Sequence, residues 1–145
     1  MAIHAAAATD MSQQSAPVIE GAVRFARTVG SGSLSILHVV TEERLRALEE
    51  ERPEEFRFAD VVIDQLRADL RQQVRVAGGG DLPVHPHVLR GEAGHVILDW
   101  AAQHEPDYLA IGVRNRSRVG KLVFGSTSQI ILLGASIPVI AIPTT

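Results

Sequence analysis

The segment from Gly112 to Ser128 carries the residue types that could bind a phosphate group. It reads GVRNRSRVGKLVFGSTS, follows an apolar stretch, and leads into a helix that we expect to begin near Ser126. Backbone N–H groups at a helix start are unpaired and the helix dipole places partial positive charge there, so an anion is favoured. Gly112 and Gly125 would let the backbone approach phosphate oxygens closely. The hydroxyls of Ser126 and Ser128 could donate hydrogen bonds to them.

Two interpretations without a ligand remain open for this segment. Ser126, followed three residues later by Gln129, is also a capping box, which is worth about 1 kcal/mol to the helix by itself. The basic side chains could equally belong to a solvated loop; they are Arg114, Arg116, Arg118 and Lys121. The place of the segment in the predicted fold favours the phosphate site.

An alternation of apolar strands and amphipathic helices positions the segment. Strands are predicted at 2–9, 34–40, 83–89, 107–112 and 138–143. Helices are predicted at 15–29, 59–74 and 126–134, and another helix carries Ala93, Val96, Ile97, Trp100 and Ala101 on one face. The stretch 41–57 is dense in charge and interrupted by Pro53, and the glycines at 78–80 indicate a loop. This alternation predicts a doubly wound α/β fold, with a five-stranded parallel sheet and helices on both faces.

The most common strand order in a five-stranded fold of this type is 3-2-1-4-5. The first and fourth strands then flank the point at which the winding direction reverses. Ligands of open α/β sheets bind at this point, beyond the carboxyl ends of the strands. Those ends carry Asp10 and Gly112, so we expect two segments that are distant in sequence to converge on one crevice.

Composition excludes several other classes of protein. A length of 145 residues, with 46% hydrophobic and 21% charged residues, predicts one folded domain over residues 1–145. The net charge of −3 and the lack of a long basic run argue against nucleic-acid binding, and no apolar stretch is long enough to span a membrane. The chain has no cysteine, which removes disulfides and thiolate chemistry and fits the cytoplasm, where we expect the protein.

Six histidines raise the question of a metal site. His85 and His87 alternate so that they share one face of a strand, but a third ligand at suitable spacing is missing. His95 and His104 belong to a predicted helix and nothing in their spacing joins them to this pair, so ordinary surface histidines are expected. The sequence contains neither a GxSxG elbow nor a GxxxxGK[ST] pattern, which argues against a serine hydrolase and a Walker-type site.

Four stretches and one glycine pattern carry a resemblance to a known family. The stretches are AATDMSQQS, LSILHVV, VLRGEAGHVILDWAAQHEPDYLAIGVRNRS and GSTSQIILLGASIPVIAIP. They resemble the universal stress proteins, whose nucleotide-binding members carry Gly, two residues, Gly, nine residues, then Gly followed by Ser or Thr. Gly112, Gly125 and Ser126 match this pattern, whereas Asn115 replaces its second glycine. Met11 is a second departure, because the family often has glycine after the aspartate.

The resemblance implies a site for ATP or AMP, with or without Mg. By similarity, Asp10 lies near the adenosine, and the backbone at Val39 and Val40 meets the adenine. The loop that ends at the helix start holds the ribose and phosphates. The full set of residues expected at the site is Asp10, Val39, Val40, Gly112, Arg114, Asn115, Gly125, Ser126, Thr127 and Ser128.

The fifth strand predicts an interface between two copies of the chain. PVIAIP would be a strongly apolar sheet edge with exposed N–H and C=O groups, and such edges tend to be covered. Pairing with its copy across a two-fold axis would satisfy these groups, and the family resemblance also implies dimers of this kind. We expect a homodimer through residues 139–142, from Val139 to Ile142.

Three functional hypotheses follow. The first is a nucleotide-binding regulatory or sensor domain of the stress response that signals through dimer shape or partners. The second is a member of the same family that acts only as an interaction module without nucleotide, and Asn115 motivates it. The third is a slow ATP hydrolase, for which Asp10 offers an acidic metal contact but no positioned base is evident, so enzymatic activity is not favoured.

Overall fold

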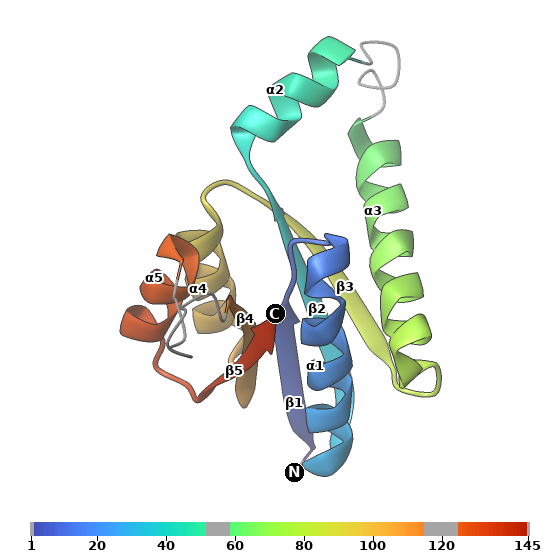
Figure 1. The fold of residues 1–145 in the computed structure, drawn as a ribbon, viewed down its shortest axis with the longest axis vertical. Coiled ribbons are helices and arrows are strands. Elements are labelled where there is room, and N and C mark those ends of the chain that lie inside the picture. Colours follow the sequence, from blue (N-terminus) through green and yellow to red (C-terminus); the bar gives the residue numbers. More distant parts are fainter. Residues whose placement is uncertain (1, 52–58, 115–124, 145) are drawn as a thin grey trace.

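The chain forms a five-stranded sheet in the order β3-β2-β1-β4-β5 (Figure 1). The computed structural model describes residues 2–51, 59–114 and 125–144. The strands are β1 (Ile3–Ala8), β2 (Ser31–Val40), β3 (Val84–Arg90), β4 (Tyr108–Arg114) and β5 (Val139–Thr144). Each neighbouring pair is parallel, so the predicted fold class and strand order are confirmed.

Helices cover both faces of this sheet (Figure 1). On one face pack α1 (Ala16–Thr28) and α3 (Ala59–Val74), and on the other α4 (Ala93–His104) and α5 (Ser126–Gly134). A short 3-10 turn at Gln13–Ser15 leads into α1, and a π-helical turn at Arg75–Gly79 follows α3. None of the helices in the described part of the chain is both long and apolar enough to cross a membrane.

The centre of the sheet is built from small side chains. Ala5, Ala6 and Ala7 of β1 are at most 2% exposed. Ala5 and Ala7 belong to the apolar core under α1 and α3, whereas Ala6 belongs to the core under α4 and α5. Alanine has weak strand propensity, so the position of β1 between β2 and β4, rather than local preference, makes this segment a strand.

Two elements differ from the sequence prediction. β2 begins at Ser31 rather than at residue 34, because the Ser31 hydroxyl bonds across to β1, donating to the carbonyl of Ile3 at 3.0 Å. The second is α2 (Glu42–Glu51), which lies in the charged stretch for which no helix was predicted. The hydroxyl of Thr41 accepts the N–H of Arg44 at 3.1 Å and caps the start of this helix. In Figure 1, α2 stands away from the sheet, beyond the carboxyl end of β2.

Candidate functional site

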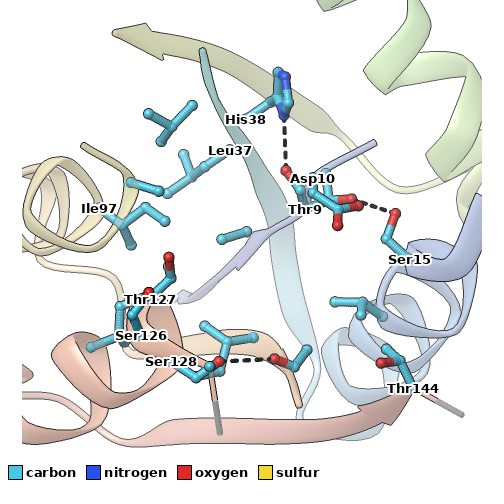
Figure 2. A pocket seen from close by; sticks show the side chains of 18 residues that line it. Thr9, Asp10, Ser15, Leu37, His38, Ile97, Ser126, Thr127, Ser128 and Thr144 are labelled. Carbon is cyan, nitrogen blue, oxygen red and sulfur yellow. Dashed lines mark hydrogen bonds between the residues drawn. The ribbon is translucent and has the colours of Figure 1, made fainter. Parts of the chain in front are cut away.

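A pocket of about 550 Å³ lies at the carboxyl ends of the central strands (Figure 2). Its rim comes from the ends of β1, β2 and β4 and from the start of α5, which are distant in sequence. Side chains from the flanking elements close its walls; they include Ser15, Val18, Ala93, Ile97, Ile131 and Thr144. The pocket occupies the point at which the winding direction reverses, and both Asp10 and Gly112 line it, as the strand order predicts.

Most of the residues expected at the site meet in this pocket. The lining includes Asp10, Val39, Gly112, Gly125, Ser126, Thr127 and Ser128. Val40 is not part of the lining: its side chain is buried, and its carbonyl accepts the N–H of Gly91 at 3.1 Å. Arg114 is the last residue of β4. Four further predictions lie outside the described residues: Asn115, Arg116, Arg118 and Lys121.

The start of α5 presents unpaired donors to the pocket. Gly125 is the N-cap of the helix and Ser126 its first helical residue, so the interpretation of Ser126 as the cap of a capping box is wrong. The Ser128 hydroxyl donates to the carbonyl of Gly112 at 3.3 Å and ties the helix to β4. Within the described part of the chain, the hydroxyls of Ser126 and Thr127 make no hydrogen bond. These hydroxyls and the N–H groups of the first turn are therefore available to an anion.

Gly112 and Gly125 lack a side chain for different reasons. A Cβ atom added to Gly112 would lie 2.6 Å from Cγ2 of Val18, so the close approach of α1 to β4 requires glycine there. Among the residues that the structure describes, a Cβ atom added to Gly125 would meet nothing within 4 Å, and the backbone φ of −71° suits any residue. The folded chain therefore explains the glycine at Gly112 but leaves an open space at Gly125.

A network of hydroxyl groups fixes the turn after β1 (Figure 2). Thr9 donates its hydroxyl hydrogen to Oγ of Ser15 at 2.9 Å and accepts the N–H of Met11 at 3.0 Å. One carboxylate oxygen of Asp10 accepts both the N–H and the hydroxyl of Ser12, at 2.9 and 2.6 Å. Met11 has a φ of 63°, in the left-handed region that favours glycine. This explains why glycine would suit the position that Met11 occupies.

His38 was not predicted as part of the site. Its Nδ1 lies 3.0 Å from the carbonyl oxygen of Thr9. Because a carbonyl can only accept, Nδ1 carries a hydrogen and donates it. Thr9, Ser15 and Thr144 also line the pocket without having been predicted. The run TDMSQQS, with hydroxyl residues on both sides of Asp10, was the feature of the sequence that could have indicated the first two.

The pocket combines two kinds of surface. One wall is apolar and includes Leu37, Val39 and Ile97, while the opposite side carries the open start of α5. Asp10 and His38 are the titratable side chains among the described lining residues. Such a pocket fits a molecule with a flat apolar part and an anionic part.

Comparisons with known proteins place the chain in a family. The sequence model of the Universal stress protein family matches residues 4–143. Among solved structures, universal stress protein UspA from Lactobacillus plantarum is 22% identical, covers 97% of each chain and has a TM-score of 0.65. A universal stress protein in complex with cAMP is 15% identical, with 99% of this chain and 98% of that chain covered and a TM-score of 0.68.

A third similar structure is the universal stress protein from Archaeoglobus fulgidus in complex with dAMP. It is 19% identical, covers 98% of each chain and has a TM-score of 0.58. No match was found among curated protein sequences. At this level of identity the solved structures support the fold, whereas the family model covers nearly the whole sequence. The chain belongs to the universal stress protein family.

Proposed function

We propose that this protein is a regulatory or sensor domain of the stress response that binds an adenine nucleotide, ATP or AMP, in the pocket at the start of α5. The observation that carries the proposal is Gly125. This glycine caps a helix whose first donors have no partner within the described residues, and neither the described neighbours nor the backbone conformation requires a glycine there. A ligand that lies against the bare backbone would explain why this residue is a glycine.

The two surfaces of the pocket suggest how the nucleotide is oriented. Phosphate oxygens accept hydrogen bonds from the first-turn N–H groups of α5 and from the hydroxyls of Ser126 and Thr127. The adenine lies against the apolar wall at Leu37 and Val39, and Asp10 accepts hydrogen bonds from the ribose hydroxyls. The cAMP and dAMP complexes of similar proteins support an adenine ligand.

Further parts of the proposal follow from the sequence. By the family resemblance, Val40 would contribute backbone near the adenine, and Arg114 and Asn115 belong to the sequence motif that would hold the phosphates. Mg²⁺ bound together with ATP would find the Asp10 carboxylate at the pocket. We treat residues 1–145 as one functional domain, and a chain without cysteine suits the reducing cytoplasm.

Titration calorimetry with Mg-ATP, AMP and GTP tests the proposal, after any co-purified nucleotide has been removed and identified by mass. We expect both adenine nucleotides to bind and GTP to bind at least roughly tenfold more weakly, a difference of about 1.4 kcal/mol. Equal binding of GTP would contradict the adenine site. No binding of any nucleotide up to millimolar concentration would favour the interaction module on the same fold.

We also propose that the protein acts as a homodimer through β5. The N–H of Leu109 donates to the carbonyl of Pro138, and β4 and β5 are parallel. Alternate residues of a strand point their backbone groups to opposite sides, so Val139 and Ala141 direct theirs to the free edge of the sheet. On the adjoining α5, Leu132 and Leu133 are 39% and 89% exposed, and a second subunit would cover such apolar surface.

The structure indicates which substitution separates dimer formation from folding. Ile140 packs in the core under α1, so a charge there would also unfold the protomer. Ala141→Pro instead removes one outward N–H group and leaves the pairing with β4 in place. We expect Ala141→Pro to sediment as a monomer with an unchanged circular dichroism spectrum, and Ala141→Ser, which keeps the N–H, to remain dimeric. A dimeric Ala141→Pro variant would exclude pairing through this edge.

A further inference from the structure

Four histidine side chains lie close together towards the amino ends of the strands, on the face of the sheet that α4 covers. His4 comes from β1, His85 and His87 from β3, and His104 from the last turn of α4. Together with Ser33, Ser35 and Trp100 they line a hollow of about 280 Å³. Sequence spacing did not connect His85 and His87 to the other histidines, but the fold brings His4 and His104 to the same hollow. We call these four side chains the histidine cluster.

The histidine cluster is organised around the indole of Trp100. The ring of His104 stacks on it, with centroids 4.5 Å apart and an interplanar angle of 14°. His87 lies 5.2 Å from Trp100 and 5.9 Å from His104 between ring centroids, and His4 lies 6.4 Å from Trp100. Trp100 is 5% exposed, and its buried Nε1 has no hydrogen-bond partner. The carboxyl-terminal half of α4 therefore contacts the sheet here through the rings of Trp100 and His104.

Hydrogen bonds hold these rings in place. Nε2 of His4 lies 2.7 Å from the hydroxyl of the buried Ser35. Nδ1 of His104 donates to the carbonyl of Trp100 at 2.9 Å. The backbone N–H of His4 donates to a carboxylate oxygen of Asp107 at 2.7 Å. The rings of His4 and His104 therefore cannot turn away from the cluster without breaking these side-chain bonds.

The surroundings of the cluster favour neutral imidazoles. Burial, followed by the nearby His104 and His85, then Arg67 of α3 and His4, lowers the pKa of His87. Burial, followed by His85, also lowers the pKa of His4, and His104 adds to this, while Asp107 acts in the opposite direction. His4 and His87 therefore resist protonation as long as the fold is intact.

We propose that the histidine cluster is an acid-responsive contact that holds the carboxyl-terminal half of α4 on the sheet at neutral pH and releases it when protons bind. Charging His4 and His87 places two positive charges in one hollow, each next to the ring of the buried Trp100. Repulsion and the cost of charging the half-buried His4 and His87 then favour an arrangement in which these two rings are more exposed to water. Because α4 contributes Trp100 and His104, the movement that exposes the rings is the release of this half of the helix.

The direction of the pH effect follows from the two lowered pKa values. An unfolded chain or a released α4 protonates these imidazoles near their ordinary pKa of 6.5, whereas the docked state does so only at lower pH. Stability is therefore complete above about pH 6.5 and is lost as the pH falls from there towards the pKa values of the folded protein.

Denaturant unfolding between pH 8 and pH 5 tests this proposal with His87→Phe, which keeps a ring against Trp100 but cannot be protonated. Below pH 6.5, the equilibrium constant for unfolding of the native sequence should rise relative to that of His87→Phe. The rise is up to roughly tenfold per pH unit, the change expected when unfolding takes up one proton. His95→Gln is the matched control, because His95 lies on the same helix but is exposed and pairs with Glu92 at 3.3 Å. If His87→Phe does not fold, His4→Gln, which can still bond Ser35, takes its place. Parallel pH profiles for all variants would overturn the proposal.

The single tryptophan of the chain provides a direct reporter. Emission from Trp100 should change with a midpoint below pH 6.5 in the native sequence, and amide exchange of the carboxyl-terminal half of α4 should accelerate over the same range. A midpoint above 6.5, or exchange that does not change, would contradict an acid-released contact. The described residues contain no group of three or more side chains placed to hold a metal ion. Stabilisation by micromolar Zn²⁺ that His87→Phe abolishes would nevertheless make the cluster a metal site and overturn the proposal.

The same helix connects the histidine cluster to the nucleotide pocket, because Ala93 and Ile97 of α4 line that pocket. Resting on the proposed function, we expect nucleotide affinity to fall between pH 7.5 and pH 5.5 by a larger factor in the native sequence than in His87→Phe. The outcomes remain separable: absence of nucleotide binding at pH 7.5 contradicts the proposed function, whereas equal pH profiles of unfolding contradict the acid-responsive contact.

Discussion

Gly112, at the carboxyl end of β4, and Gly125, at the start of α5, belong to one sequence motif but meet opposite surroundings. Val18 of α1 fills the space beside Gly112, and a side chain there would collide with it. Beside Gly125 no described residue comes within 4 Å of an added Cβ atom, and the backbone is unstrained. Packing therefore accounts for the first glycine, whereas we propose that the second is required by a bound ligand.

Gly125→Val tests the second of these reasons and should give the largest effect. A branched side chain at the N-cap would occupy the place proposed for the phosphates. We expect nucleotide affinity to fall by roughly 100-fold or more, about 2.7 kcal/mol. Loss of a favourable N-cap residue should lower the free energy of unfolding by about 1 kcal/mol or less. Calorimetry and denaturant unfolding on the same sample measure both quantities.

The matched control is Gly32→Val. Gly32 is exposed near the start of β2, where an added Cβ atom would meet only Ala2, at 3.9 Å. This variant should bind nucleotide like the native protein. If Gly125→Val also bound with native affinity, the phosphates would have to lie elsewhere, and the open space at Gly125 would need another explanation.

Features of this chain that follow a local pattern or a general rule of topology could be predicted from the sequence, whereas those that depend on the detailed geometry of a turn could not. The strand ends and the start of α5 were predictable because each is a local pattern, and the strand order brings Asp10 and Gly112 together by a general rule. The hydroxyl groups of Thr9 and Ser15 were missed because their role depends on a turn whose geometry no periodicity reveals. Physical patterns thus predicted the position of the pocket better than its polar lining.

The histidine cluster shows where such prediction ends. His4, His87 and His104 lie on three separate elements, and no spacing rule connects them. Their proximity follows from the register that places His87 opposite Leu37 and from the docking of α4 over β2 and β3. Register and docking are decided by the packing of whole elements, so residues in such a cluster become recognisable only in three dimensions.

Gly112→Ala tests the packing reason and should mainly affect stability. The added methyl group would lie 2.6 Å from Cγ2 of Val18, a stiff side chain that is 2% exposed. We expect the free energy of unfolding to fall by about 2 kcal/mol, as for other overpacked cores. Val18→Ala should restore part of this loss when combined with Gly112→Ala, with a coupling of about 1 kcal/mol in a double-mutant cycle. Additive effects would mean that Val18 is not the reason for the glycine.

Met11 is a third case to set beside Gly112 and Gly125. Its backbone conformation favours glycine, yet the chain has a methionine there. Its φ of 63° costs a non-glycine residue about 1 kcal/mol, while its side chain packs against the core under α1. Met11→Gly and Met11→Ala both lose that packing, but only alanine keeps the strained conformation. We therefore expect Met11→Gly to unfold with a free energy about 1 kcal/mol higher than Met11→Ala. Equal stabilities would show that the turn relaxes, and that the hydrogen bond from the Met11 N–H to Thr9 does not fix its backbone.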